Sequence, residues 1–588
     1  MLLNVCRLLI VLFFCGYIAE VDAQETPASY QVQMQVKVPL RDGVHLNATL
    51  YRPDPLKDPL PVIFLFTPYP QDTSHSSGAY FAAHGYIYAA VDVRGRGESE
   101  GVFDPFAHDA QDGYDLVEWF AKQPWCNGKV AMFGGSYAGG DQWQTAMIRP
   151  PHLTTIVPTA SAHAGVDFPA FHHILTPYDV QWLALTRGHI LYEQVFEDRL
   201  WSDAAKRLYL DKAPFKDMDA YTGTKSEIFQ TWIRHPDLDE YWKSRTGSRA
   251  QVNAVNIPVL EVTGSHDGDE PGALSYHVDR EASPASAEKT FLVIGPWDHS
   301  GTRDPKQDVG DEHFGAASLI DILGLHLQWY DYTMKSGPRP AFLQKNVMYY
   351  VAGSGAECWK SADSLSQASS SSLTLFLDAS GGAKSVYHSG VLSPRANGAT
   401  GGEWQSDPND LSAANQPDAQ PGATLHGDGL VFHSAPFAED TEIDGRIDLR
   451  LWLSIDAPDT DLAASLYLVT PDGKSHSLTD SALRARYRNS EEKPEPIREN
   501  QPEEYRFSPD QPFFAQRAPK GSQLRLVLMS LNDPQHEKNW NSMKPVADQT
   551  GQDARVAHIR LLQTTEHPST LTLPLGDVHA GCKASASM

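Results

Sequence analysis

Short, continuous runs of apolar residues recur in the first half of the chain, and they constrain its fold more than any other feature. The runs lie at residues 62–66, 86–93, 130–133, 156–158, 259–262 and 291–294. Runs of this length fit strands that are buried on both faces of a mostly parallel sheet. Residues 112–122 and 318–335 instead repeat their apolar positions every three or four residues, which is the period of a helix. The sequence therefore predicts an α/β core.

The segment ahead of these runs has a different period. Apolar residues alternate with polar ones over residues 30–38, and the alternation resumes from Val44 to Leu50. Arg41-Asp42-Gly43 supplies a turn between the two segments. We therefore expect a β-hairpin ahead of the buried strands.

Two other parts of the chain lack the buried-strand pattern. From residue 162 to 256, aromatic, leucine and charged residues recur at helical spacing, which predicts a helical insertion. After residue 343, clusters of Asp, Gly, Pro and Ser separate short alternating segments, which is typical of a β-sandwich or jelly roll. The expected organisation is a split α/β domain at residues 24–161 and 257–343, a helical insertion at 162–256 and a β domain at 344–588.

The first residues have the pattern of an export signal. Arg7 precedes the apolar stretch 8–14, and Val21 and Ala23 form a small-residue cleavage site. The stretch is too short to span a bilayer, and no later segment approaches the roughly 20 apolar residues that a spanning helix needs. We therefore expect residues 1–23 to be a signal peptide and the mature chain to be soluble and exported, either periplasmic or secreted. A retained N-terminal anchor is the alternative.

The charge of the chain excludes one large class of partners. It has 48 Lys and Arg residues against 74 Asp and Glu, a formal net charge of −26, and no run of basic residues. Phosphate backbones and anionic lipids are bound by basic surfaces. We therefore expect no binding of nucleic acid and no general affinity for membranes.

The sequence offers little for a metal or a cofactor. Outside the signal peptide the cysteines are Cys126, Cys358 and Cys582, an odd number at wide spacing, so at most one disulfide can form and no Cys-x-x-Cys metal motif exists. Gly95-Arg96-Gly97 follows a strand, but Glu100 stands at the third glycine position of a dinucleotide-binding loop. No His-Glu-x-x-His motif is present. We expect neither a cofactor nor a catalytic metal.

The clearest chemical motif is Gly134-Gly135-Ser136-Tyr137, which follows the buried run at residues 130–133. A nucleophile elbow needs small neighbours, because the serine backbone is strained and its Oγ must stand clear at a strand-to-helix turn. Ala138 occupies the usual position of the second glycine, and Gly139 follows it. The motif predicts a serine nucleophile, and the alternative is a glycine-rich turn without catalysis.

A nucleophile elbow also predicts an acid and then a histidine further along the chain, each after a strand. Asp267 and His299 follow the last two buried runs in this order. His299 would take the proton of Ser136 and return it to the leaving group, while Asp267 would hold the imidazole tautomer. Asp269 and Asp298 are the competing acids.

Acyl transfer also requires hydrogen-bond donors where negative charge develops on the substrate oxygen. The residue after the nucleophile supplies one of them, the backbone N–H of Tyr137. Thr67-Pro68-Tyr69-Pro70 follows an early strand, and the phenol of Tyr69 could be the second donor. The alternative for Tyr69 is a packing role in a proline-flanked turn.

Several motifs resemble those of the X-prolyl dipeptidyl-peptidase-like serine hydrolases, also called CocE/NonD hydrolases, which include cocaine esterase and the α-amino-acid ester hydrolases. They lie at residues 41–43, 50–53, 68–69, 92–101, 134–137, 295–299, 457–461 and 483–488. The resemblance implies an α/β-hydrolase core, a helical cap formed by the insertion and a C-terminal jelly roll. It also implies a triad of Ser136, Asp267 and His299, with Tyr69 and Tyr137 forming the oxyanion hole. The chain departs from the family pattern at Ser265, where the family often has Trp.

The substrate is suggested by the acidic residues that follow the expected triad acid. In α-amino-acid ester hydrolases, two carboxylates at these offsets and a third from the cap bind the substrate ammonium. The resemblance assigns this role to Asp269 and Glu270, with Asp167 as the first choice for the third residue and Asp179 as the second. Clustered carboxylates would favour a cationic α-amino group. A solvated acidic loop is the alternative.

The sequence therefore predicts a serine hydrolase that cleaves ester or amide bonds of small molecules or short peptides through an acyl-enzyme, with a preference for α-amino-acyl groups. A carboxylesterase or acylase for other acyl groups and an X-prolyl dipeptidyl-peptidase are the alternatives among enzymes. The alternative outside catalysis is an exported binding module with an idle triad. The oligomeric state stays open, including a homo-oligomer.

Overall fold

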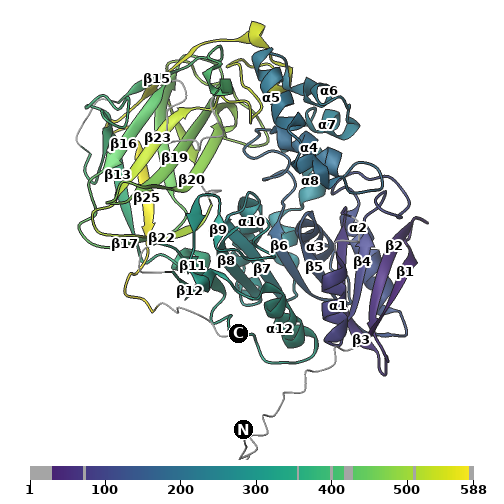
Figure 1. The fold of residues 1–588 in the computed structure, drawn as a ribbon. Helices are drawn as coiled ribbons and strands as arrows, with labels where there is room; N and C mark the ends of the chain where they lie inside the picture. The colour runs from purple at the N-terminus through teal and green to yellow at the C-terminus, as the bar shows by residue number, and fades with distance from the viewer. Residues whose placement is uncertain are drawn as a thin grey trace, which may run out of the picture.

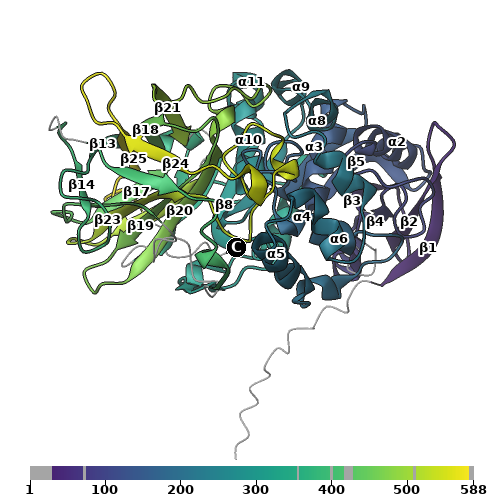
Figure 2. The same cartoon turned by 90° about the horizontal axis from the view of Figure 1, so that it is seen from above.

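The computed structural model describes residues 29–581 except 70–73, 354–356, 397–400, 416–427 and 508–511. The expected signal peptide at residues 1–23 lies outside this range. Figures 1 and 2 show a β domain on one side of the molecule, the N-terminal strands at the opposite end, and helices between them.

The α/β part is built on a ten-stranded sheet in the order β1-β2-β4-β3-β5-β6-β7-β8-β11-β12. Its strands are β1 Tyr30–Pro39, β2 His45–Pro53, β3 Leu60–Thr67, β4 Ile87–Asp92, β5 Cys126–Ser136, β6 Leu153–Ser161, β7 Val259–His266, β8 Thr290–Asp298, β11 Val347–Val351 and β12 Cys358–Ala362. Strands β3 to β8 and β11 pair in parallel. The continuous apolar runs are therefore central parallel strands, and β4 is buried along its whole length. The expected hairpin is β1 and β2, which pair antiparallel.

Helices cover both faces of this sheet. They are α1 His75–Ala83, α2 Asp109–Ala121, α3 Tyr137–Met147, α10 Glu270–Glu281, α11 Pro284–Ala287 and α12 Ile322–Met334. Helices α1 and α12 contribute to one apolar cluster, and α2, α3 and α10 contribute to another. The predicted helices at residues 112–122 and 318–335 correspond to α2 and α12. A small hairpin, β9 Asp308–Val309 and β10 Glu312–His313, lies between β8 and α12.

The segment between β6 and β7 forms a helical cap. Its helices are α4 Pro177–Leu185, α5 Leu200–Leu210, α6 Met218–Tyr221, α7 Glu227–Trp232, α8 Glu240–Thr246 and α9 Arg249–Ala254. Side chains of Ser226, Asp239 and Ser248 accept hydrogen bonds from the first free backbone N–H groups of α7, α8 and α9. Apolar residues of the cap join the sheet cluster that includes α2 and α3. The cap is thus packed on the sheet, above the ends of its parallel strands (Figure 1).

The first sheet extends beyond the domain boundary that we expected at residue 343. Strands β11 and β12 lie after this boundary, yet β11 pairs in parallel with β8 and β12 pairs with β11. All five residues of β11 are buried, as are all residues of the central strand β4. Cys358 in β12 is disulfide-bonded, and Cys126 is a free thiol.

The remaining strands form a separate thirteen-stranded β domain with its own apolar cluster. They are β13 Ser371–Asp378, β14 Gly390–Ser393, β15 Glu403–Ser406, β16 Gly429–Ser434, β17 Thr441–Gly445, β18 Asp448–Ile455, β19 Asp461–Val469, β20 Ser475–Arg484, β21 Pro502–Phe507, β22 Phe514–Ala518, β23 Gln523–Ser530, β24 Ala557–Leu561 and β25 Thr570–Leu575. Every second residue of β18 is buried, which is the pattern of a strand with one face on a core. The jelly-roll topology stays a prediction.

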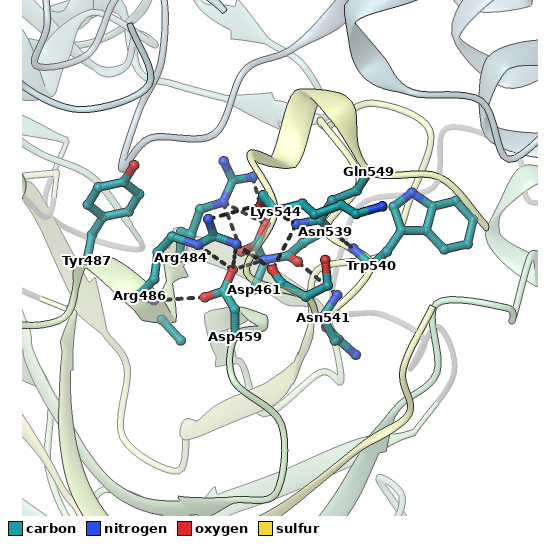
Figure 3. Close-up of polar contacts among 12 residues, drawn as sticks. Asp459, Asp461, Arg484, Arg486, Tyr487, Asn539, Trp540, Asn541, Lys544 and Gln549 are labelled. Carbon is teal, nitrogen blue, oxygen red and sulfur yellow. Dashed lines mark hydrogen bonds and ion pairs between the residues drawn. The ribbon is translucent and has the colours of Figure 1, made fainter. Parts of the chain in front are cut away.

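A buried ionic network connects the β domain to the cap (Figure 3). Arg484 forms ion pairs with Asp461 at 2.9 Å and with Glu537 at 2.8 Å, and its guanidinium also donates to the backbone carbonyl of His173 in the cap segment. Tyr487 stacks on His173 at 3.6 Å between ring centroids. A neighbouring pair, Arg486 with Asp459, belongs to the same network, and Asn539 donates to both aspartates. The family motifs at residues 457–461 and 483–488 therefore have a structural role at this junction.

None of the helices in the described part of the chain combines the length and hydrophobicity that a membrane crossing requires.

Candidate active site

Ser136 occupies a strained turn between β5 and α3. Its φ and ψ are 65° and −127°, and only a tightly determined structure holds a residue other than glycine there. The glycines around it are needed for close packing. A Cβ on Gly134 would lie 2.6 Å from Leu65, and one on Gly139 would lie 2.8 Å from the carbonyl oxygen of Thr159. The steric requirement thus falls on Gly139, which explains why Ala138 is tolerated.

The structure brings Asp267 and His299 together at the ends of adjacent strands. Asp267 follows β7 and His299 follows β8, and Nδ1 of His299 lies 2.8 Å from Oδ1 of Asp267. Burial by itself would lower the pKa of His299, but the hydrogen bond to Asp267 and the nearby charge of Asp269 raise it above its usual value. Asp298 accepts instead from Ser300 Oγ and from the backbone N–H of Gly301, so it holds the loop rather than the imidazole.

The hydroxyl group of Tyr69 lies beside Ser136, the expected nucleophile. It forms a hydrogen bond with the side chain of Ser136, and it accepts one of 3.0 Å from Nε1–H of Trp182 in α4. Burial raises the pKa of Tyr69, so the phenol stays protonated and can donate. Tyr137 begins α3, and the N–H of a first helical residue has no acceptor within the helix. Both expected oxyanion donors therefore lie beside Ser136.

The side chain of Tyr137 has a separate task. Its hydroxyl group donates to Asp109 and accepts from the backbone N–H of Phe106 at 2.8 Å. Its ring stacks on Phe106 and on Trp182, with centroids 4.2 Å and 5.9 Å apart. Tyr137 thus fixes the start of α3 between the sheet and the cap.

Ser136 opens into a cavity of about 550 Å³. Its walls come from β3, β5, α1, the cap helix α4, the loop after β8 and α12. The residues with polar side chains that line it include Tyr69, Ser136, Trp182, His299, Arg303 and His326. Trp182, Arg303 and His326 could not be predicted as site residues, because nothing in their local sequence distinguishes them from other cap, loop and helix residues.

The acidic residues that we expected near the site separate into two groups. Oδ2 of Asp269 lies 3.7 Å from Nδ1 of His299. The pKa of Asp269 is raised to about 7, chiefly by burial. The charge of His299 opposes this shift, and the charge of Asp267 adds to it. Asp167 is half-buried, and desolvation and the charge of Asp269 raise its pKa. Its two oxygens accept from the backbone N–H groups of His163 and Gly272 at 2.7 and 2.9 Å.

The other two carboxylates have different surroundings. Glu270 is fully buried at the start of α10, and its neighbours include Asp267 and, from the β domain, Phe513 and Arg446. Asp179, the second choice for the third carboxylate, accepts from the backbone N–H of Thr176 and caps α4. Asp167 and Asp269 are therefore the carboxylates that the structure places together.

Within the described residues, one group of His, Cys, Asp and Glu side chains is compact enough to hold a metal ion. It consists of Asp267, Asp269 and His299, whose donor atoms lie within 4.8 Å of one another. Nδ1 of His299 already bonds to Asp267 at 2.8 Å, so a metal at this point would have to replace that hydrogen bond.

Known proteins resemble this chain in both of its domains. The family model described as X-Pro dipeptidyl-peptidase (S15 family) matches residues 42–301, and the X-Pro dipeptidyl-peptidase C-terminal non-catalytic domain matches residues 342–572. Cocaine esterase of Rhodococcus sp. (strain MB1 Bresler) is 27% identical over 582 residues, covering 93% of this chain and 99% of that protein.

Solved structures share the fold over almost the whole chain. An aminopeptidase from the marine sediment archaeon Thaumarchaeota archaeon has a TM-score of 0.78 at 22% identity, covering 96% of this chain and 100% of that one. An α-amino acid ester hydrolase has the same TM-score at 21% identity, again with 96% and 100% coverage. With its two matching family domains, the chain belongs to the X-prolyl dipeptidyl-peptidase-like (S15) serine hydrolases, the CocE/NonD group, and is an enzyme that hydrolyses ester or peptide bonds.

Proposed function

We propose that Ser136, Asp267 and His299 form the catalytic triad of this hydrolase. The observation that carries the proposal is the strained backbone of Ser136, with φ of 65°, at a cavity that His299 also lines. The 2.8 Å hydrogen bond from His299 to Asp267 leaves Nε2 as the nitrogen that can accept a proton. Asp267 fixes that tautomer and stabilises the imidazolium that forms.

The reaction then has two halves. His299 takes the proton of Ser136, whose Oγ attacks the carbonyl carbon, and negative charge develops on the carbonyl oxygen. The hydroxyl group of Tyr69 and the backbone N–H of Tyr137 donate to this oxygen. The tetrahedral intermediate collapses, and His299 gives its proton to the leaving group. Water, deprotonated by His299, attacks the acyl-enzyme in the same way and releases the acid and free Ser136.

Trp182 supports the oxyanion hole from the cap. Its Nε1–H donates to the oxygen of Tyr69 at 3.0 Å. That bond occupies a lone pair of the phenol oxygen, so the Tyr69 proton is directed away from the cap and is available to the reaction.

The acyl group that we propose carries an α-amino group. The charge of Asp269 raises the pKa of Asp167, and both carboxylates are half-buried. Buried carboxylates without a cationic partner are costly, and a substrate ammonium would offset that cost. Glu270 lies on the β-domain side of Asp267 and is a weaker candidate for the same role. Hydrolysis of other acyl groups and X-prolyl dipeptidyl-peptidase activity are the competing specificities.

One experiment tests the nucleophile and the acyl preference together. Purified wild type, Ser136→Ala and Asp167→Asn are assayed on 4-nitrophenyl esters of alanine and of propionic acid, and labelled with a fluorophosphonate. We expect Ser136→Ala to lose labelling and to lower kcat/KM by about 10⁴-fold or more. We expect Asp167→Asn to lower the alanyl-over-propionyl ratio of kcat/KM by roughly tenfold. Labelling that persists in Ser136→Ala excludes the triad, and an unchanged ratio excludes the ammonium site.

The proposed location is outside the cytoplasm, on the basis of the signal-like pattern at residues 1–23. Intact-mass analysis of protein recovered from the periplasm or medium should give a chain that begins at Gln24. A chain that keeps residues 1–23 would support the retained anchor instead.

A further inference from the structure

The catalytic cavity contains a cation that the proposed triad does not use. Arg303 stands four positions after His299 and lines the cavity with Ser136. No carboxylate of the described residues lies within 4.0 Å of its guanidinium, the distance of an ion pair. A Cβ built on Gly135 would lie 2.6 Å from Nη1 of Arg303, so the guanidinium rests against the backbone next to the nucleophile. Its charge acts on Tyr69, Asp269 and His299.

Buried polar side chains form another part of the cavity wall. His326 in α12 is 2% exposed, and neither ring nitrogen has a hydrogen-bond partner within the described chain. Burial lowers its pKa to about 3, so the ring is neutral and has one N–H donor and one acceptor. Tyr88 and Thr159 are at most 1% exposed. Within the described chain, the hydroxyl group of Thr159 has no hydrogen-bond partner, and that of Tyr88 interacts only with the hydroxyl group of Ser74.

These groups are unusual for a protein interior, because buried polar side chains are nearly always hydrogen-bonded. All of them line the same cavity as Arg303, and the rings of His326 and Tyr88 both pack against Phe133, at 5.7 and 6.1 Å. The wall therefore offers donors and a positive charge, with apolar surface between them. A ligand that satisfies it carries a negative charge and hydrogen-bond acceptors.

We propose that this wall is a specificity subsite for a carboxylate of the substrate, in which Arg303 supplies the charge and His326, Tyr88 and Thr159 supply neutral hydrogen bonds. A guanidinium matches a carboxylate in geometry and binds it through two parallel hydrogen bonds. One cation balances one carboxylate, whereas a phosphate dianion would keep an unbalanced charge. The inference rests on the proposed function, because the cavity is a substrate site only if Ser136 is the nucleophile.

Taken with the acidic pair, this subsite gives the candidate active site two poles, of which Arg303 lines the cavity and the acidic pair lies behind His299. Asp167 and Asp269 lie on the Asp267 side of His299, and Arg303 lies against Gly135. A substrate that carries both an ammonium group and a carboxylate group satisfies both poles. The two groups can lie on opposite sides of the scissile bond, or both can belong to the acyl group. The substrate class that we infer is therefore a zwitterionic ester or amide of an amino acid.

The test compares substrates that differ in one carboxylate. In the acyl arm, 4-nitrophenyl hydrogen glutarate is compared with 4-nitrophenyl pentanoate. In the leaving-group arm, 3-acetoxybenzoate is compared with phenyl acetate. Each pair is assayed with wild type, Arg303→Gln, Arg303→Lys, Tyr88→Phe and the control Arg199→Gln, which removes an exposed cap arginine outside the cavity.

We expect Arg303→Gln to lower the charged-over-neutral ratio of kcat/KM by about 10- to 100-fold in one of the two arms, which identifies the half of the substrate that carries the carboxylate. Arg303→Lys should restore part of the ratio, Tyr88→Phe should lower it by roughly 3- to 10-fold, and Arg199→Gln should leave it unchanged. The subsite is overturned if Arg303→Gln leaves the charged-over-neutral ratio of kcat/KM unchanged in both arms. It is also overturned if Arg199→Gln lowers this ratio as much as Arg303→Gln does. Hydrolysis of phenyl acetate that survives in Ser136→Ala would instead overturn the proposed function.

Discussion

Asp269 interacts with three other charged or titratable groups of the candidate active site, His299, Asp267 and Arg303. Its carboxylate is 3.7 Å from His299 and also interacts with Arg303. Burial alone would lower the pKa of His299, and the bond to Asp267 and the charge of Asp269 turn this into a raised pKa. The histidine must be neutral to accept the proton of Ser136, so activity should fall as the pH drops through this raised pKa.

We predict that Asp269→Asn moves the acidic limb of the pH profile to lower pH. The substitution removes a negative charge that favours imidazolium, so the pKa of His299 falls and the base stays neutral in more acidic solution. The measurement is kcat/KM against pH with a neutral ester. Asp304→Asn, an exposed carboxylate on the same loop, is the control and should leave the limb in place. A limb that stays fixed, or moves to higher pH, would contradict the assignment of His299 as the base.

The sequence was enough to find the nucleophile, acid and base candidates, because each follows a buried strand and the strand ends meet at one edge of the sheet. It could not identify Trp182 as the partner of Tyr69, because the two are 113 positions apart and meet only when the cap closes on the sheet. Arg303 and Glu270 illustrate the same limit. Their charges and their distances in sequence from His299 and Asp267 indicate that they are near the site. Only the packing of the folded chain determines that Arg303 lines the cavity and that Glu270 has neighbours from the β domain.

At the scale of elements, the ends of β19 and β20 are joined to the cap through Arg484. The guanidinium is 2% exposed and is shared by Asp461, Glu537 and the carbonyl oxygen of His173. Such a network stabilises the folded state little more than well-packed apolar residues of similar volume would. Removing one partner, however, leaves uncompensated buried charges. Its energetic importance therefore lies in the cost of breaking it.

We predict that Arg484→Met lowers the free energy of unfolding by about 3–5 kcal/mol, because Asp461 and Glu537 would stay buried without their cation. Arg506→Met is the matched control. Arg506 pairs with Asp448 at 2.9 Å but is 47% exposed, and loss of such a surface pair costs less than about 1 kcal/mol. Urea unfolding followed by circular dichroism measures both. Equal effects of the two substitutions would show that the network is no more important than a surface ion pair.

Element boundaries were predictable only where the residue pattern changes. The helical insertion begins and ends where buried strands stop and resume, between β6 and β7. The boundary at residue 343 followed from Asp, Gly, Pro and Ser clusters, which were given more weight than the apolar run at residues 347–351. That run pairs with β8 and belongs to the first sheet.

At the scale of the whole molecule, the hydrolase sheet and the β domain are not independent bodies. Ala352, directly after β11, exchanges backbone hydrogen bonds of 2.9 and 2.8 Å with Ala515 and Arg517 of β22. An apolar cluster at this junction combines residues of both domains, including Ile294 of β8 with Phe513. The buried Glu270 and Arg484 lie at further points of contact between the domains and the cap. Domains that share backbone hydrogen bonds and an apolar cluster lose these contacts when either one unfolds, which couples their unfolding.

We therefore predict that the enzyme unfolds in one cooperative transition, and that damage to the β domain is felt at the active site. Leu449 is fully buried in the β-domain core, and Leu449→Ala should cost about 2–5 kcal/mol. Thermal unfolding is followed by circular dichroism and, in parallel, by a fluorescent phosphonate attached at Ser136. If the domains are coupled, both probes report the same midpoint in the wild type, and Leu449→Ala lowers both midpoints together. An early transition seen by circular dichroism, with the phosphonate signal unchanged, would mean that the β domain unfolds separately and that the contacts of β22 with Ala352 do not transmit stability.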